Sequence, residues 1–225
     1  MAMRGIMAVT VLFMLMGSLF GQAGGDTGLQ VREDDGGNVV VRTASGLLNQ
    51  NSSLRRKWVA IDDLSSPVRL NRTGVFPRFD EKGQMNFLMP VGTVSPNQAI
   101  SAIEVRYLLF DVWGQRLRTL ALTKLVDSST NVDLREGPGW PAWEPEVSQL
   151  VTVVAFVARV RTAEGQVWAF DAEKLVPQIQ ALGLSVTTPD LTPDEQRAIN
   201  PQGIYWTYYP VQKAPAASAT GNPNP

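Results

Sequence analysis

The stretch AISAIEVRYLLFDVWGQRLRTLAL, residues Ala99 to Leu122, decides the fold. In its first half, strict alternation places four apolar side chains on one face of an extended strand: Ile103, Val105, Tyr107 and Leu109. The opposite face begins charged and becomes apolar further along, which is typical of a strand that runs from the rim into the middle of a covered sheet. Because the WGQ segment before the second extended run is so short, the two runs must pair antiparallel. The stretch therefore predicts a buried β-hairpin.

A second hairpin is predicted over residues 147–170. Its first run, VSQLVTVVAFVARVRT, is rich in valine, whose branched side chain favours a strand over the competing helix. By strict alternation Val160 shares one face with Val154 and Phe156, and Val157 lies on the other. An AEG turn then leads into the short run QVWAF.

Shorter apolar runs at residues 58–61, 68–70 and 85–94 add further strands. Short strands separated by turn signals are typical of two packed sheets. We expect an all-β protein, an antiparallel, immunoglobulin-like β-sandwich over residues 54–171, with a short C-terminal helix and flexible ends.

The first 23 residues predict a secretory signal peptide. Arg4 precedes an almost wholly apolar run from Gly5 to Phe20, and small residues follow up to Ala23, where we expect cleavage. The apolar run is shorter than the roughly 20 residues of a membrane-spanning helix, and an uncleaved N-terminal anchor is the alternative. The sequence thus predicts an exported protein (periplasmic, cell-surface or secreted) with no membrane insertion once the leader is removed.

Residues 24–53 form a glycine-rich segment. The Asp35-Gly36 step between two apolar runs predicts a small hairpin, and the following TASGLLNQNSS predicts a linker. Since an isolated hairpin is marginal in water, it either docks on the domain or stays mobile.

After the second hairpin the period of the pattern becomes helical. Apolar residues from Ala172 to Leu182 predict a short helix over residues 172–183, beginning either after an Asp171 N-cap or at Pro177. Thr192 opens a capping-box pattern that leaves room for a further turn or two of helix. Residues 184–225 are otherwise predicted to be an extended aromatic and Pro/Ala-rich tail.

The segment Tyr107-Leu108-Leu109-Phe110-Asp111, followed after two residues by Gly114, resembles the motif that names the FxLYD family of small bacterial β-sandwich domains. Tyr107 stands at the motif's Phe position and Phe110 at its Tyr position. The resemblance covers about residues 67–170 and implies an immunoglobulin-like sandwich in an exported protein, in a family without assigned catalysis. The long segment Val126 to Glu146 departs from the compact family pattern and leaves strand order there open.

Composition excludes several kinds of chemistry. The chain has no cysteine and no histidine, so disulfides, thiol nucleophiles and histidine-based triads are absent, and a zinc site is not expected. Glu144 and Glu146 are the nearest carboxylate pair for a glycosidase, and solvated loop charges are their simpler interpretation. The net charge is −1, and the sequence has no block of like-charged residues, so nucleic acid is not an expected partner. We expect no enzyme, no cofactor and no metal site.

Aromatic residues outside the predicted core are the candidate binding surface. Trp140 and Trp143 lie three apart between prolines, and either form an exposed platform for a sugar ring or a protein, or pin their loop over one end of the sandwich. Tyr205 and Trp206 either add an edge strand to their own sheet or to a partner's. The other strand or turn tryptophans, Trp113 among them, are expected in core or edge packing.

These observations predict a non-enzymatic, exported module that contacts or supports another envelope or secreted protein. The alternative is a carbohydrate-binding module that uses the loop tryptophans, with a glycan as its ligand.

Overall fold

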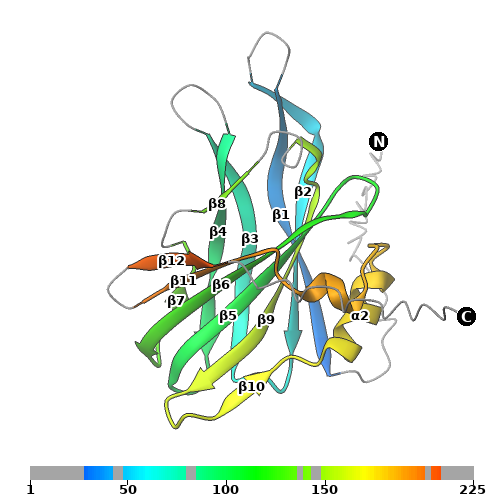
Figure 1. Ribbon diagram of the computed structural model, residues 1–225. Helices are drawn as coiled ribbons and strands as arrows, with labels where there is room; N and C mark the ends of the chain where they lie inside the picture. The colour runs from blue at the N-terminus through cyan, green and yellow to red at the C-terminus, as the bar shows by residue number, and fades with distance from the viewer. Residues whose placement is uncertain are drawn as a thin grey trace, which may run out of the picture.

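A computed structural model describes residues 28–42, 48–79, 85–135, 139–142, 148–200 and 204–208. In these ranges the chain forms an all-β sandwich of two packed sheets with one α-helix (Figure 1). The elements are β1 (Leu29–Arg42), β2 (Leu48–Asp63), β3 (Val68–Phe79), β4 (Met85–Pro96), β5 (Ile100–Phe110), β6 (Arg116–Ser128), β7 (Val132–Asp133), β8 (Trp140–Pro141), β9 (Thr152–Thr162), β10 (Val167–Ala169), α2 (Ala172–Ala181), the 3₁₀-helix η1 (Thr188–Leu191), β11 (Glu195–Ile199) and β12 (Tyr205–Tyr208).

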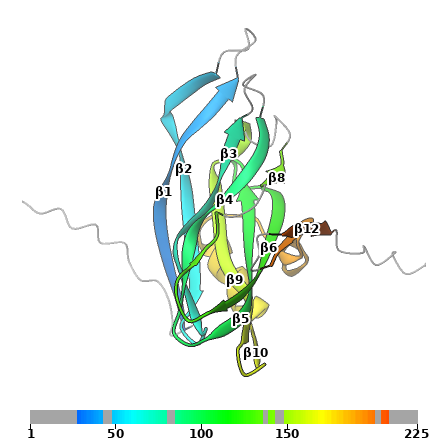
Figure 2. The same ribbon diagram turned by 90° about the vertical axis from the view of Figure 1, so that its left-hand side faces the viewer.

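The larger sheet has the strand order β1-β2-β9-β5-β6-β11-β12, and β10 pairs with the end of β9 beyond β2. The antiparallel pairing of β5 with β6 confirms the predicted hairpin in the opening stretch. In the smaller sheet β4 pairs with β3 on one edge and with β7 and β8 on the other. Figure 2 shows the β3–β4 pair beside the long β1–β2 pair.

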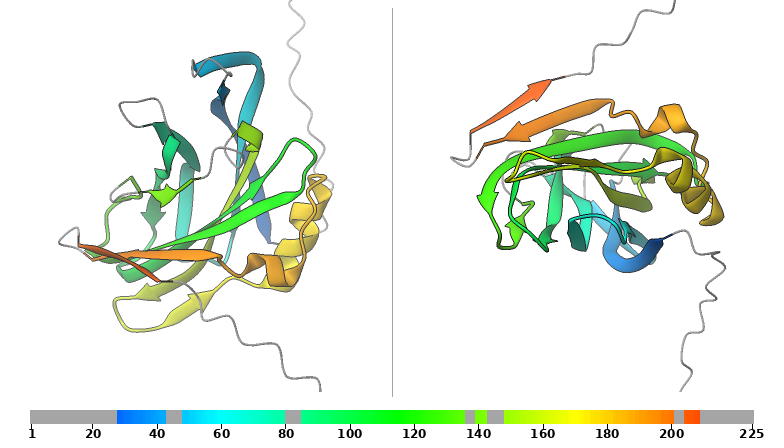
Figure 3. Two further views of the ribbon diagram at one scale, coloured as in Figure 1. Left: turned by 45° about the horizontal axis from the view of Figure 1, so that its top comes forward. Right: turned by 90° about the horizontal axis from the view of Figure 1, so that it is seen from below.

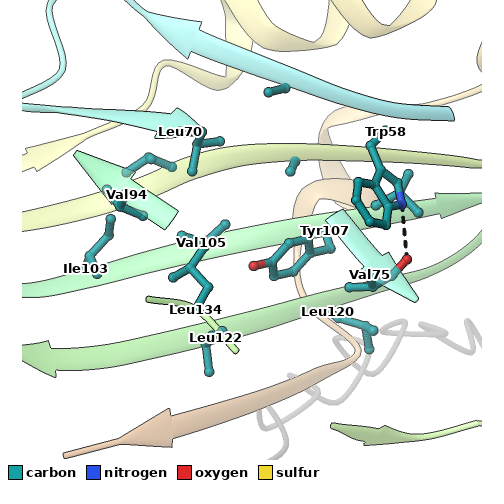
Figure 4. Packing of buried hydrophobic residues seen from close by; sticks show 14 of the residues in the cluster. Trp58, Leu70, Val75, Val94, Ile103, Val105, Tyr107, Leu120, Leu122 and Leu134 are labelled. Atoms are coloured by element: carbon teal, nitrogen blue, oxygen red, sulfur yellow. Dashed lines mark hydrogen bonds between the residues drawn. The ribbon is translucent and has the colours of Figure 1, made fainter. Parts of the chain in front are cut away.

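The first face of β5 lies against the smaller sheet. Val105 and Tyr107 are buried in one cluster with Leu70 of β3 and Val94 of β4 (Figure 4). Leu109 belongs to the same cluster. The predicted alternation is confirmed here, and it explains how a single strand places its aromatic residue at the centre of the sandwich.

The second face of β5 lies against α2. Leu108 and Phe110 belong to a separate cluster with Leu175 and Ile179 of the helix, on the side away from the smaller sheet (Figure 3). The helix begins after Asp171, whose side chain accepts a hydrogen bond from the Glu173 backbone at 3.0 Å. The predicted start after an Asp171 N-cap is therefore correct, and the alternative start at Pro177 is wrong. Pro177 lies inside the helix, where its missing N–H leaves one backbone hydrogen bond unformed.

A β-bulge in β9 alters the predicted side-chain pattern. Glu104 of β5 pairs with Arg159 and the next residue, Val105, pairs with Val157, so Ala158 is the extra residue. Beyond the bulge the faces exchange, and Val160 packs in the cluster of Val157. Its predicted placement beside Phe156 is therefore wrong.

The N-terminal segment is longer and more regular than expected. Leu29–Arg42 is one strand, and Asp35 to Asn38 form a bulge in it, because Gly37 adopts a φ of +84° while Asp35 accepts a hydrogen bond from its backbone. The hairpin predicted at Asp35-Gly36 is therefore wrong, and so is the linker over residues 48–53, which belong to β2. The predicted signal peptide, residues 1–23, lies outside the described residues.

The C-terminal segment also belongs to the sheet. The capping box is formed by Thr187 and Asp190 rather than Thr192, and residues 195–199 form a strand instead of helix. β11 pairs parallel with β6, so the tail predicted to start at residue 184 is wrong over residues 184–200, and the pairing of β12 with β11 confirms the edge strand predicted at Tyr205 and Trp206. No local pattern signals the pairing of β11 with β6, because its partner strand lies about 75 residues earlier.

Two strand pairs are parallel, β2 with β9 and β6 with β11, so the sandwich is not the purely antiparallel one expected. Within the described residues no helix has the length and apolar character to cross a membrane.

Candidate functional site

Trp140, the first predicted binding residue, lies inside the sandwich. Its side chain is fully buried and packs edge-on against Tyr107, with ring centroids 5.8 Å apart. The preceding Gly139 lies so close to β4 that a Cβ there would be 2.1 Å from the Leu88 carbonyl oxygen. The interpretation of Trp140 as an exposed platform is wrong. The alternative is correct for Trp140, whose buried side chain holds its loop against the sandwich.

The other predicted residues divide into two groups. Trp143 lies outside the described residues, as do Glu144 and Glu146. Tyr205 and Trp206 lie in β12, where their backbones pair with Ile199 and Ala198 of β11. Their strand therefore extends the protein's own sheet.

The structure places a different tryptophan at the surface. Trp113 is 80% exposed and its neighbour Val112 is 55% exposed, in the turn between β5 and β6. Its predicted assignment to core or edge packing is wrong, because alternation predicts burial along a strand and a turn residue lies outside that pattern. We call the four residues from Val112 to Gln115 the β5–β6 tip. The signal that could have found it is the WG dipeptide, since glycine marks the turn and leaves the tryptophan at its apex.

Hydrogen bonds hold the backbone of the tip. The Asp111 side-chain Oδ1 accepts from the backbone nitrogens of Trp113 at 2.9 Å and Gln115 at 2.8 Å. Gly114 has a φ of +73° and donates its N–H to the Asp111 carbonyl. The turn is therefore fixed by its own residues.

The tip also rests on the segment that follows α2. The Ser185 backbone donates to the Gly114 carbonyl at 2.8 Å, and Gln115 forms a β-bridge with Ser185. A Cβ at Gly114 would lie 2.7 Å from the Gly183 carbonyl oxygen, so this contact needs glycine. In Figure 1 the green turn lies next to one end of the helix.

Arg116, just after the tip, ties β6 to η1. Its guanidinium contacts Asp190 at 3.0 Å and Asp194 at 2.8 Å. The Thr187 hydroxyl donates to Asp190 at 2.6 Å, and this bond, with the nearby guanidinium, holds the pKa of that carboxyl below its usual value. Exposed apolar side chains thus lie on a well-anchored backbone.

Among the described residues, two buried glutamates are each paired with arginines. Glu104 pairs with Arg106 and Arg159, and Glu195 pairs with Arg118 and Arg197. Within the described ranges, no three acidic side chains lie close enough together to hold a metal ion. No protein-family model, curated protein or solved structure matches the chain.

Proposed function

We propose that this protein is a non-enzymatic, exported interaction module that contacts another envelope or secreted protein through the β5–β6 tip. The observation that carries the proposal is Trp113, which is 80% exposed on a backbone fixed by Asp111 and by the segment after α2. Trp113 and Val112 together form an exposed apolar patch, and tryptophan is enriched among the residues that dominate binding energy at protein interfaces.

Burial of Trp113 against a partner contributes a large favourable free energy to binding. Burying a tryptophan removes roughly 150–250 Å² of surface, which contributes on the order of 4–6 kcal/mol at about 25 cal/mol per Å². Because the tip is already ordered, little further conformational entropy is lost on binding. The leader-like N-terminus supports export of the protein, and the YLLFD resemblance supports an immunoglobulin-like class for the sandwich. The carbohydrate-binding alternative required an exposed Trp140 and is not proposed.

The test is saturable capture of a partner from the envelope fraction of the source organism. The Trp113→Ala protein should lose that capture, because the main apolar anchor is gone. Val112→Ser should weaken it, and the matched control Val167→Ser should leave it unchanged, since Val167 is 63% exposed but lies in β10. Capture that is unaffected by Trp113→Ala, or no saturable partner at all, would overturn the proposal.

A second variant tests the anchored backbone. Asp111→Ala keeps Trp113 but removes both side-chain hydrogen bonds to the tip. We expect affinity for the captured partner to fall by about tenfold, because a less restrained tip loses more conformational entropy on binding. This change corresponds to about 1.4 kcal/mol of binding free energy. Amide hydrogen exchange at residues 112–115 should quicken while exchange in β5 and β9 stays slow. Unchanged exchange in the tip would contradict the role given to Asp111.

A further inference from the structure

A cavity of about 260 Å³ lies between the large sheet and the α2–η1 segment. It opens among β5, β9 and the first turn of the helix, on the face of the sheet opposite the smaller sheet. It shares no lining residue with the β5–β6 tip. At about 30 Å³ per water, its volume equals about nine waters, which suits a small organic molecule.

Small residues and two aromatic rings shape the cavity. Ala158, Ala169 and Ala172 line the cavity with small side chains that leave this space open, and Ala158 lies on the same face of β9 as Val154 and Phe156. Phe156 and Phe170 form an apolar wall, with ring centroids 5.4 Å apart in an edge-on arrangement. One part of the cavity is therefore apolar.

Two arginines form the polar part. Arg106 Nε donates to Glu104 at 2.8 Å, and its Nη1 donates to the Leu191 carbonyl at 2.8 Å. Arg159 donates to the other oxygen of Glu104 through Nε at 3.0 Å and through Nη2. The Gln196 amide completes the shell of the carboxylate at 3.2 Å.

The Arg106–Glu104–Arg159 cluster has hydrogen-bond donors without an acceptor and an excess positive charge. Two guanidinium groups surround one carboxylate, so the cluster has a net charge of +1. Within the part of the chain that the structure describes, Arg106 Nη2 and Arg159 Nη1 make no hydrogen bond. The bulge places Arg159 on the cavity side of β9, where strict alternation would have turned it to the opposite face.

We propose that this cavity binds a small amphipathic carboxylate, with its anionic end at Arg106 and Arg159 and its apolar end against Phe156 and Phe170. A planar guanidinium is the donor best matched to a carboxylate, and the lining threonines Thr188 and Thr192 add hydroxyl donors. An apolar wall beside a few convergent polar groups is the usual make-up of a small-molecule site. This binding does not depend on the proposed function of the tip.

The test uses hexanoate and phenylacetate as probes with the purified protein. Isothermal titration calorimetry should show saturable binding of at least one acid, and its neutral counterpart, 1-hexanol or 2-phenylethanol, should bind at least about tenfold more weakly. Trp168 fluorescence gives a second readout, because its ring lies 5.9 Å from that of Phe170. Equal binding of acid and alcohol, or saturable binding of neither acid, would overturn the proposal.

Variants locate the site. Arg159→Gln removes one of the two cationic groups of the cavity while Arg106 still pairs with Glu104, and should weaken binding of the acid by about tenfold. Ala172→Leu fills the cavity with a residue that favours helix and should abolish binding. Arg161→Gln, two residues along β9 and exposed, should bind the acid like the wild type. If Arg159→Gln and Ala172→Leu fold and bind like the wild type, the cavity is not the site. Trp113→Ala should leave acid binding unchanged, which separates this proposal from that of the tip.

Discussion

At the scale of single residues, the centre of the sandwich contains two polar atoms that lack a partner. The Tyr107 hydroxyl and Trp140 Nε1 are buried and make no hydrogen bond within the described residues. Trp58 differs, because its indole nitrogen donates to the Val75 carbonyl at 3.1 Å (Figure 4). A buried hydroxyl without a partner typically costs about 1–3 kcal/mol, so Tyr107 contributes through its ring and not through its oxygen.

The first prediction is that Tyr107→Phe keeps or raises stability near pH 8, by up to about 2 kcal/mol, since it removes an unsatisfied group and keeps the ring. Burial raises the pKa of Tyr107 above its ordinary value of 10.0. The folded state therefore keeps this proton at a pH where the unfolded state loses it, and stability falls as the pH rises above about 10. The variant should lack this part of the alkaline loss.

Urea denaturation of both proteins at pH 8 and pH 11 measures this effect. The difference in unfolding free energy between variant and wild type should grow with pH in favour of the variant. A loss of more than about 1 kcal/mol at pH 8 would instead show that the hydroxyl has a partner, such as a buried water.

At the scale of elements, Trp58 of β2 is enclosed by glycines from its neighbours. A Cβ at Gly74 of β3 would lie 2.4 Å from the indole, and one at Gly36 of β1 would lie 2.8 Å from its nitrogen. Both glycines sit in bulged segments of their strands. The irregularities therefore bring three strands close together around one ring.

The second prediction is that Gly74→Ala destabilises the protein by about 2–4 kcal/mol, because the indole must move from its packed position. Gly37→Ala is the control, because a Cβ there has no atom within 4 Å. Only the backbone strain of an alanine at a φ of +84° should lower its stability, by about 1 kcal/mol. Combined with Trp58→Leu, Gly74→Ala should cost much less than it does alone. Additive losses in thermal denaturation would rule out this steric explanation.

The same elements show what sequence reasoning could and could not reach. The β5–β6 hairpin and the two faces of β5 follow from alternation, which depends on neighbouring residues. The bulge at Ala158 was missed because one inserted residue reverses alternation without a local signal. It was this bulge that brought Arg159 to the cavity. Trp113 was missed because a turn residue lies outside the alternation of the strands, although the WG dipeptide marks the turn locally.

At the scale of the whole molecule, the last described strands complete the large sheet. β11 pairs parallel with β6 along Leu120 to Lys124, and its Glu195 is buried and hydrogen-bonded by Arg118 at 2.5 Å. Arg118 also donates to the Pro141 carbonyl, so the segment carrying Trp140 is connected to this strand. The C-terminal strands thus support both the sheet and the loop that closes the sandwich.

The third prediction follows from this connection. A chain ending at residue 193 loses β11 and β12, exposes one edge of β6 and removes the carboxylate that faces Arg118. Because an unpaired buried charge costs about 3–5 kcal/mol and apolar surface is exposed as well, this protein should be unfolded or lose most of its stability. A chain ending at residue 212 lacks only the Pro/Ala-rich end and should melt within about 1 °C of the wild type. Thermal denaturation followed by circular dichroism measures both, and a cooperative transition near the wild-type temperature in the shorter chain would show that β11 is not an integral strand of the sheet.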